Sequence, residues 1–211
     1  MKTKKLLFYL LAAILGGCVP VMSLHPLYTK EDVAFDEKLV GTWVDDSNNT
    51  WEFKSVNNPP NPIAYELTFR EDEDKKGLFL THLVELENEL FLDVSPKQFP
   101  CGQLGELNEM EWPYNAFFFV PAHTFIKIDS IEPQLKMRWV TVDAMKELLK
   151  EDPNAVKHEE DEIILTASTK ELQAFVLKYA DDNKVFSTEV VLTRKKDKGT
   201  QESGAQDPNE G

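Results

Sequence analysis

Polar and apolar side chains alternate along much of the chain between residues 39 and 194. In "AYELTFR" (64–70) every second residue is aromatic or aliphatic, and "TWEFKS" (50–55) and "LKMRWV" (135–140) repeat this pattern. A period of two is typical of antiparallel strands with one buried and one solvated face. "LFLTHLVEL" and "ELFLDV" are more continuously apolar, which indicates central strands, and the Glu87-Asn88 pair between them suits a tight hairpin. The chain is therefore predicted to be mainly β.

The pattern predicts ten strands. Their ranges are 39–45, 50–55, 64–70, 78–86, 89–95, 116–120, 123–131, 134–141, 162–167 and 189–194.

Two helices are predicted among the late strands. "DAMKELLKEDP" has Asp143 as its expected N-cap, ends before Pro153 and should bury Met145, Leu148 and Leu149. In "STKELQAFVLKYADD", Ser168 and Glu171 have the spacing of a capping box. Its apolar stripe falls at i, i+3, i+4 and i+7, which indicates core packing against the sheet rather than a ligand site. The stripe consists of Leu172, Phe175, Val176 and Tyr179, and the predicted solvated face holds Lys170, Gln173 and Lys178.

These elements predict an α+β fold, mainly β with two helices. The expected architecture is an antiparallel β-barrel or sandwich with the late helices packed on the sheet. We expect one β-rich domain over residues 37–194. Residues 18–36 are predicted to form a lipidated N-terminus and tether, ordered near Phe35. Residues 195–211 contain no large apolar side chain and are predicted to be a disordered polar tail.

The N-terminal residues have the composition of an export signal. Three lysines within the first five residues precede an apolar run, Leu6 to Leu15, of about half the length that a membrane-spanning helix needs. The following Leu15-Gly16-Gly17-Cys18 resembles the lipobox of bacterial lipoproteins. The alternative is an ordinary signal peptide followed by a chance cysteine.

The lipobox resemblance implies cleavage of a signal peptide, residues 1–17, and lipidation of Cys18. A thioether-linked diacylglycerol and an N-terminal acyl chain such as palmitate would hold the protein on a membrane. Val19 is not the aspartate that retains Gram-negative lipoproteins at the inner membrane. The resemblance therefore implies the outer membrane, facing the periplasm, whereas a Gram-positive host would have no such sorting.

Net charge narrows the range of partners. Removal of residues 1–17 takes away three lysines and no acidic residue, so the net charge falls from −14 to −17. Nucleic-acid binding depends on basic side chains that neutralise phosphates, so this class of partner is excluded. Attachment to anionic headgroups through charge is also not expected, which leaves the acyl chains as the membrane contact.

Two family resemblances follow from short blocks of sequence. Gly41-Thr42-Trp43 is similar to the Gly-x-Trp that opens the first strand of lipocalins, and it implies a Trp that closes one end of a barrel. The chain lacks the later Thr-Asp-Tyr motif of that family. "SLHPLYTKEDVAFDEKLVGTWV", "HLVELENELFLDV", "PAHTFIKI" and "LTASTKELQAFVLKYADD" resemble a set of uncharacterised bacterial lipoproteins, for which the resemblance implies no activity.

Catalytic and metal-binding motifs are absent from the sequence. It contains no Gly-x-Ser-x-Gly, no phosphate-binding loop and no His-Glu-x-x-His, and "HEEDE" at His158 lacks a second histidine. The stretch from Asp72 has the glycine of a calcium loop but Lys76 and Leu83 at ligand positions. We therefore expect no metal, no cofactor and no enzymatic activity.

Two histidines, His82 and His123, bear on this expectation. Cys101 and His123 could form a nucleophile–base pair, although Cys101 could equally be an idle loop thiol. Cys101 is the only cysteine besides Cys18, so no structural disulfide is expected. His82 shares a strand face with apolar neighbours and is predicted to be a hydrogen-bonded core residue rather than a metal ligand.

Two functions remain open from the sequence. The first is a non-catalytic interaction or structural module of the cell envelope that serves a protein partner. The second is a lipocalin-like carrier whose apolar interior encloses a hydrophobic small molecule.

Overall fold

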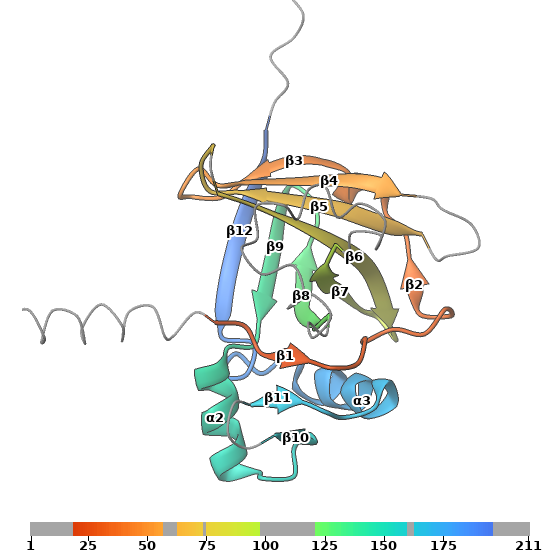
Figure 1. Cartoon of the computed structure of the whole chain (residues 1–211), viewed down its shortest axis with the longest axis vertical. Coiled ribbons are helices and arrows are strands. Elements are labelled where there is room, and N and C mark those ends of the chain that lie inside the picture. The colour runs from red at the N-terminus through yellow and green to blue at the C-terminus, as the bar shows by residue number, and fades with distance from the viewer. Residues whose placement is uncertain (1–18, 57–62, 74, 98–120, 160–162, 196–211) are drawn as a thin grey trace, which may run out of the picture.

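Eight strands of the described chain close into an antiparallel β-barrel. The computed structural model describes residues 19–56, 63–73, 75–97, 121–159 and 163–195. Around the barrel the strand order is β3-β4-β5-β6-β7-β8-β9-β12, and β12 pairs with both β9 and β3 to complete the ring. The first seven strands follow one another as a meander (Figure 1). The expected mainly β fold with late helices is confirmed, and the barrel is consistent with a lipocalin-like architecture.

The barrel strands are β3 (Gly41–Val44), β4 (Thr50–Val56), β5 (Ala64–Arg70), β6 (Lys76–Leu86), β7 (Glu89–Pro96), β8 (Thr124–Ser130), β9 (Gln134–Trp139) and β12 (Thr188–Arg194). Outside the ring lie β1 (Met22–Ser23), β2 (Val33–Ala34), the 3-10 turn η1 (Glu37–Leu39), α2 (Val142–Glu151), β10 (His158–Glu159), β11 (Ile164–Leu165) and α3 (Thr169–Tyr179). The predicted strand over 116–120 and the predicted tail beyond Lys195 lie outside the described residues.

Alternation along the strands produces two hydrophobic cores. Side chains of one parity point into the barrel and fill it, and those of the other parity on β6–β8 point outward. The inner core includes Trp43, Phe53, Tyr65, Leu67, Leu83, Leu92, Leu135, Met137 and Leu192. The outer core joins Val84, Leu86, Phe91 and Phe125 of the barrel wall to Met145, Leu165, Leu172, Phe175, Val176 and Phe186.

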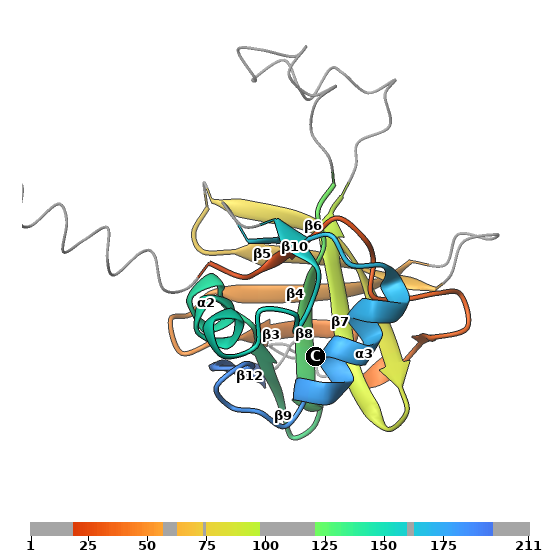
Figure 2. The ribbon, with the colours of Figure 1, turned by 90° about the horizontal axis from the view of Figure 1, so that it is seen from below.

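The helices cover one side of the barrel. Figures 1 and 2 show α2 and α3 beside the short β10–β11 strands, on the side away from β4 and β5. The predicted apolar stripe of α3 is confirmed as core, because Leu172, Phe175 and Val176 are buried. This packing explains why β6 and β7 are apolar on both faces: one face lines the barrel and the other supports α3.

Glycine at the start of β3 is required by the backbone and by a close neighbour. Gly41 has a φ of +132°, a backbone conformation that is strained for a residue with a side chain. A Cβ atom at this position would also lie only 2.6 Å from Nη1 of Arg194. Two residues later, Trp43 is fully buried. Its indole N–H donates to the Leu39 carbonyl of η1 (3.0 Å), and the Arg194 guanidinium lies 4.2 Å from the ring centre.

The start of α2 differs from the prediction. The N-cap is Thr141, not Asp143, because the Thr141 backbone is extended and its hydroxyl accepts the Ala144 amide hydrogen at 3.1 Å. Asp143 lies in the first turn, where its charge still complements the helix dipole. Met145 is buried as expected, and Leu148 and Leu149 are partly buried.

Candidate functional site

The residue predicted to be lipidated, Cys18, lies outside the described residues, but the chain is described from the next residue onward. Residues 19–28, the N-terminal segment, do not form a free tether. Val21 and Leu27 are buried, and β1 pairs in parallel with β11. The predicted tether therefore lies on the domain from Val19, because its alternate side chains enter the outer core.

Backbone hydrogen bonds hold both edges of the N-terminal segment. On one edge, the Val21 amide donates to Val140 (2.9 Å) and the Val142 amide donates to Val19 (3.0 Å). Ser23 and His123 exchange two bonds of 2.8 Å. On the other edge the Leu24 amide donates to Leu165 at 2.9 Å. The segment is thus held by residues just before β8, just after β9 and in β11. The first of these bonds is at Val19, one residue after Cys18.

A buried carboxylate holds the end of this segment. Asp93, on the outer face of β7, is fully buried. Its Oδ2 accepts the Leu27 amide hydrogen at 2.7 Å, and its Oδ1 lies 2.6 Å from Nδ1 of His123. A buried carboxylate is tolerated only when such partners replace its hydration. The acid therefore anchors the N-terminal segment and orients the His123 ring.

His82 lies next to this pair but is bonded differently from the prediction. It is nearly buried, opposite Asp93 in the β6–β7 ladder, and its ring centre is 4.2 Å from that of Tyr28. Its Nδ1 is buried without a hydrogen-bond partner among the described residues, which corrects the predicted hydrogen-bonded core histidine. Burial lowers the pKa of His82 and outweighs the opposing effect of Asp93. The ring is therefore neutral at neutral pH.

The chemistry that Asp93, His123 and His82 could perform is limited by the groups around them. An Asp–His pair can orient a general base, but a nucleophile must lie within reach. Within the described residues, no hydrogen bond joins the His123 ring to a hydroxyl or thiol. The other member of the predicted pair, Cys101, lies outside those residues. The described part of the chain also contains no group of three or more acidic, His or Cys residues able to hold a metal ion.

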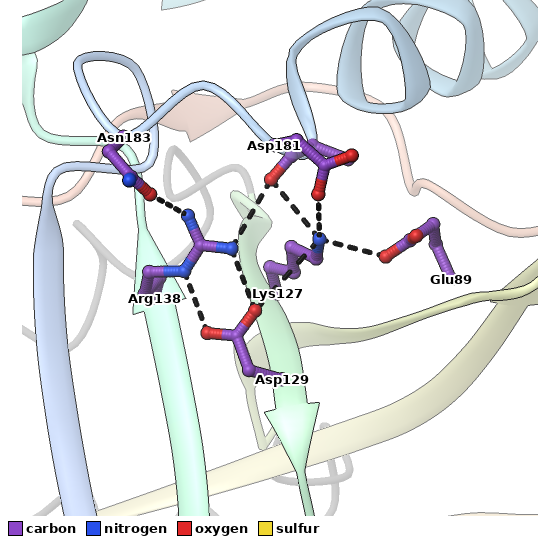
Figure 3. Close-up of polar contacts among 7 residues, drawn as sticks. Glu89, Lys127, Asp129, Arg138, Asp181 and Asn183 are labelled. Carbon is purple, nitrogen blue, oxygen red and sulfur yellow. Dashed lines mark hydrogen bonds and ion pairs between the residues drawn. The ribbon is translucent and has the colours of Figure 1, made fainter.

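A second polar cluster fixes the C-terminal end of α3 (Figure 3). The almost fully buried Lys127 ammonium, from β8, lies 2.8 Å from Glu89 and 3.2 Å from Asp181, and donates to the Ala180 carbonyl at 3.2 Å. Arg138 binds Asp129 through two bonds of 2.7 Å and donates to Asn183 at 2.8 Å.

Both cations donate to the carbonyl of Ala180, the C-cap of α3, where the helix dipole favours positive charge. Bonding to Asp129 raises the pKa of Arg138 further. The arrangement fastens α3 to three barrel strands, and we interpret this second cluster as structural.

Two hollows in the described structure lie outside the barrel interior. One is a small apolar cavity of about 10 Å³ between the helices and the barrel wall, lined by Phe125, Met145 and Phe175 among others. This volume is about that needed to hold one water molecule. The other is a groove of about 260 Å³ where residues 154–157 meet α3. It is smaller than the roughly 300–1,000 Å³ of common ligand sites.

Asp93 is the site residue that sequence reasoning missed. A detectable signal was present, because Asp93 is the only charged side chain inside the apolar run "LFLDV". A charge at a buried strand position points to a buried partner. The sequence did not indicate which partner, since Leu27 and His123 lie 66 and 30 residues away.

Comparison of the chain with protein-family models, curated proteins and solved structures found no match. Among the helices of the described residues, none combines the length and the hydropathy of a membrane span.

Proposed function

We propose that this protein is a lipoprotein, anchored to the outer membrane through acyl chains on Cys18, and that it acts as a non-catalytic interaction or structural module facing the periplasm. The observation that carries the proposal is the short apolar run that ends in Leu15-Gly16-Gly17-Cys18. Two or more acyl chains suffice for stable attachment, so no basic surface is needed.

The way the chain uses its apolar surface supports a module more than a carrier. Bulky side chains fill the barrel, and Trp43, Phe53, Tyr65 and Met137 are each at most 1% exposed. The outer core adds α2, α3 and the N-terminal segment to the barrel wall. The apolar side chains of both cores are therefore used for internal packing rather than to line a ligand cavity. The outer surface of the domain remains available to a protein partner.

Replacement of Cys18 tests the anchor. We expect Cys18→Ser to produce a soluble periplasmic protein, because the thioether and the acyl chains cannot form without the thiol. The measurement is cell fractionation followed by mass determination of the isolated protein. The matched control is Cys101→Ser, which removes the other cysteine and should leave the protein in the membrane fraction. A Cys18→Ser protein that stays there would refute the anchor.

A lipocalin-like carrier of a hydrophobic small molecule is the second candidate. The closed eight-stranded ring of the described strands favours it, together with the Gly41-Thr42-Trp43 start of β3. Barrels of this size either fill with side chains or hold one small ligand. Organic extraction of the native protein, followed by mass spectrometry, separates the two: a stoichiometric apolar compound supports the carrier, and an empty extract supports the module.

A further inference from the structure

The exposed apolar side chains are concentrated next to Cys18. In the described residues the large apolar side chains that are more than about one third exposed are Val19, Met22, Leu24, Phe35 and Ile63. Three of these five fall within the first six residues after Cys18, and Met22 and Leu24 are 47% and 41% exposed. The N-terminal segment, "VPVMSLHPLY", also contains no Lys, Arg, Asp or Glu, although the mature chain carries a net charge of −17.

The exposure of Met22 and Leu24 follows from the way the segment is bound. Residues 22 and 24 have the same parity, so they share the face opposite to the buried Val21 and Ser23. Ser23 is held by His123 on one side, and Leu24 is bonded to Leu165 on the other. The backbone cannot rotate these two side chains inward without losing both sets of bonds.

The proposed anchor at Cys18 leaves little distance between the membrane and the face formed by Met22 and Leu24. A fully extended chain spans at most about 3.6 Å per residue, so Leu24 lies at most about 22 Å from Cys18. The first bond to the domain is already made at Val19, whose carbonyl accepts the Val142 amide hydrogen. A lipid on Cys18 must have its glycerol at the headgroup level, which places the bound segment at the membrane surface.

We propose that Met22 and Leu24 form a bilayer-contacting face, so that the domain is seated directly on the membrane in one orientation rather than suspended on a tether. The inference rests on the proposed lipidation of Cys18. Uncharged apolar side chains at this level insert into the boundary between headgroups and acyl chains, about 5–10 Å deep. A protein partner on the same face would have to occupy the space of the headgroups around the anchor.

Site-specific labels test the seating. The lipidated full-length protein carries Cys101→Ser and one new cysteine, from Met22→Cys or Leu24→Cys, which bears an environment-sensitive dye. The reference is Lys54→Cys on β4, because this side chain is exposed and β4 lies on the side of the barrel away from β1 (Figure 1). Each protein is reconstituted into vesicles of phosphatidylethanolamine and phosphatidylglycerol and tested with an aqueous quencher and with a quencher attached to lipid.

We expect the dyes at positions 22 and 24 to be several-fold less accessible to the aqueous quencher than the dye at 54, and to be quenched by the lipid-borne group. The same labels on the soluble Cys18→Ser protein should be open to water. Protection already present in that soluble form would indicate contact with protein and overturn the proposal. Labels that stay open to water on vesicle-bound protein would overturn the seating alone, whereas protein that does not float with the vesicles would overturn the anchor as well.

Discussion

Trp43 connects three parts of the barrel through one side chain. Its ring lies in the inner core, its N–H binds η1, and the guanidinium of Arg194 on β12 covers it. Arg194 in turn donates to the Val40 carbonyl at 2.9 Å and to the Lys38 carbonyl. The first and last strands of the ring meet at this residue, because Trp43 pairs with Arg194 in the β3–β12 ladder.

Truncation of this indole should therefore weaken the closure of the barrel. We expect Trp43→Ala to lower the free energy of unfolding by about 3–5 kcal/mol, the usual cost of a buried aromatic truncation. Trp51→Ala is the matched control, since Trp51 is only half-buried and should cost clearly less. Denaturant titration of both variants gives the comparison, and equal losses would show that Trp43 has no special place in the barrel.

At the scale of the element, α3 is fastened at both ends. Near its start, Thr169 donates to the Pro26 carbonyl (2.8 Å), and Gln173 donates to Leu27 (2.9 Å) and to Asp32 (2.8 Å). Gln173 was predicted to face solvent, but it holds the N-terminal segment instead. Near its end, Lys127 and Arg138 bind the Ala180 carbonyl. The helix therefore acts as a bridge between the N-terminal segment and the barrel wall.

The buried stripe of α3 should contribute more to stability than its cap. Phe175 is 3% exposed, and we expect Phe175→Ala to lower the free energy of unfolding by about 3–5 kcal/mol through an unfilled cavity. The Ser168 hydroxyl donates to Glu171 at 2.7 Å, a bond that alanine cannot make, so Ser168→Ala should cost about 1 kcal/mol.

Lys170→Ala, on the exposed face, is the control for these two variants and should change stability little. Thermal or denaturant unfolding of the three purified proteins gives the order. If Phe175→Ala melted like the parent, the stripe would be a free docking face rather than a core.

At the scale of the whole molecule, the sequence was sufficient for the strands of the barrel, although it left a barrel and a sandwich open, but not for the attachments outside the ring. Each barrel strand is a local pattern of alternation, so β3 to β9 and β12 were found within a few residues. The stripe of α3 was equally legible from its spacing, and Phe175 was correctly assigned to the core. These features depend on neighbours along the chain, which periodicity reports directly.

The N-terminal segment was mispredicted because its contacts are distant in sequence. Its two prolines and few apolar clusters resemble a linker, yet its bonds reach Val140 and Leu165, more than a hundred residues away. No local pattern reports such a pairing. Asp93 gave a partial signal, but its partners became evident only once β7, β8 and the segment were brought together.

Removal of the Asp93 carboxylate should release the segment without opening the barrel. In Asp93→Ala the Leu27 amide and the His123 ring lose their buried acceptor, which costs about 2 kcal/mol. Local opening of the segment would then be about thirtyfold more frequent. Hydrogen exchange should show this acceleration at the Ser23 and His123 amides, while the β4–β5 amides keep the parent rates. Asp46→Ala, at an exposed turn, should alter neither group. If exchange accelerated equally in both groups, the segment and the barrel would unfold as one unit, and Asp93 would be a global rather than a local fastening.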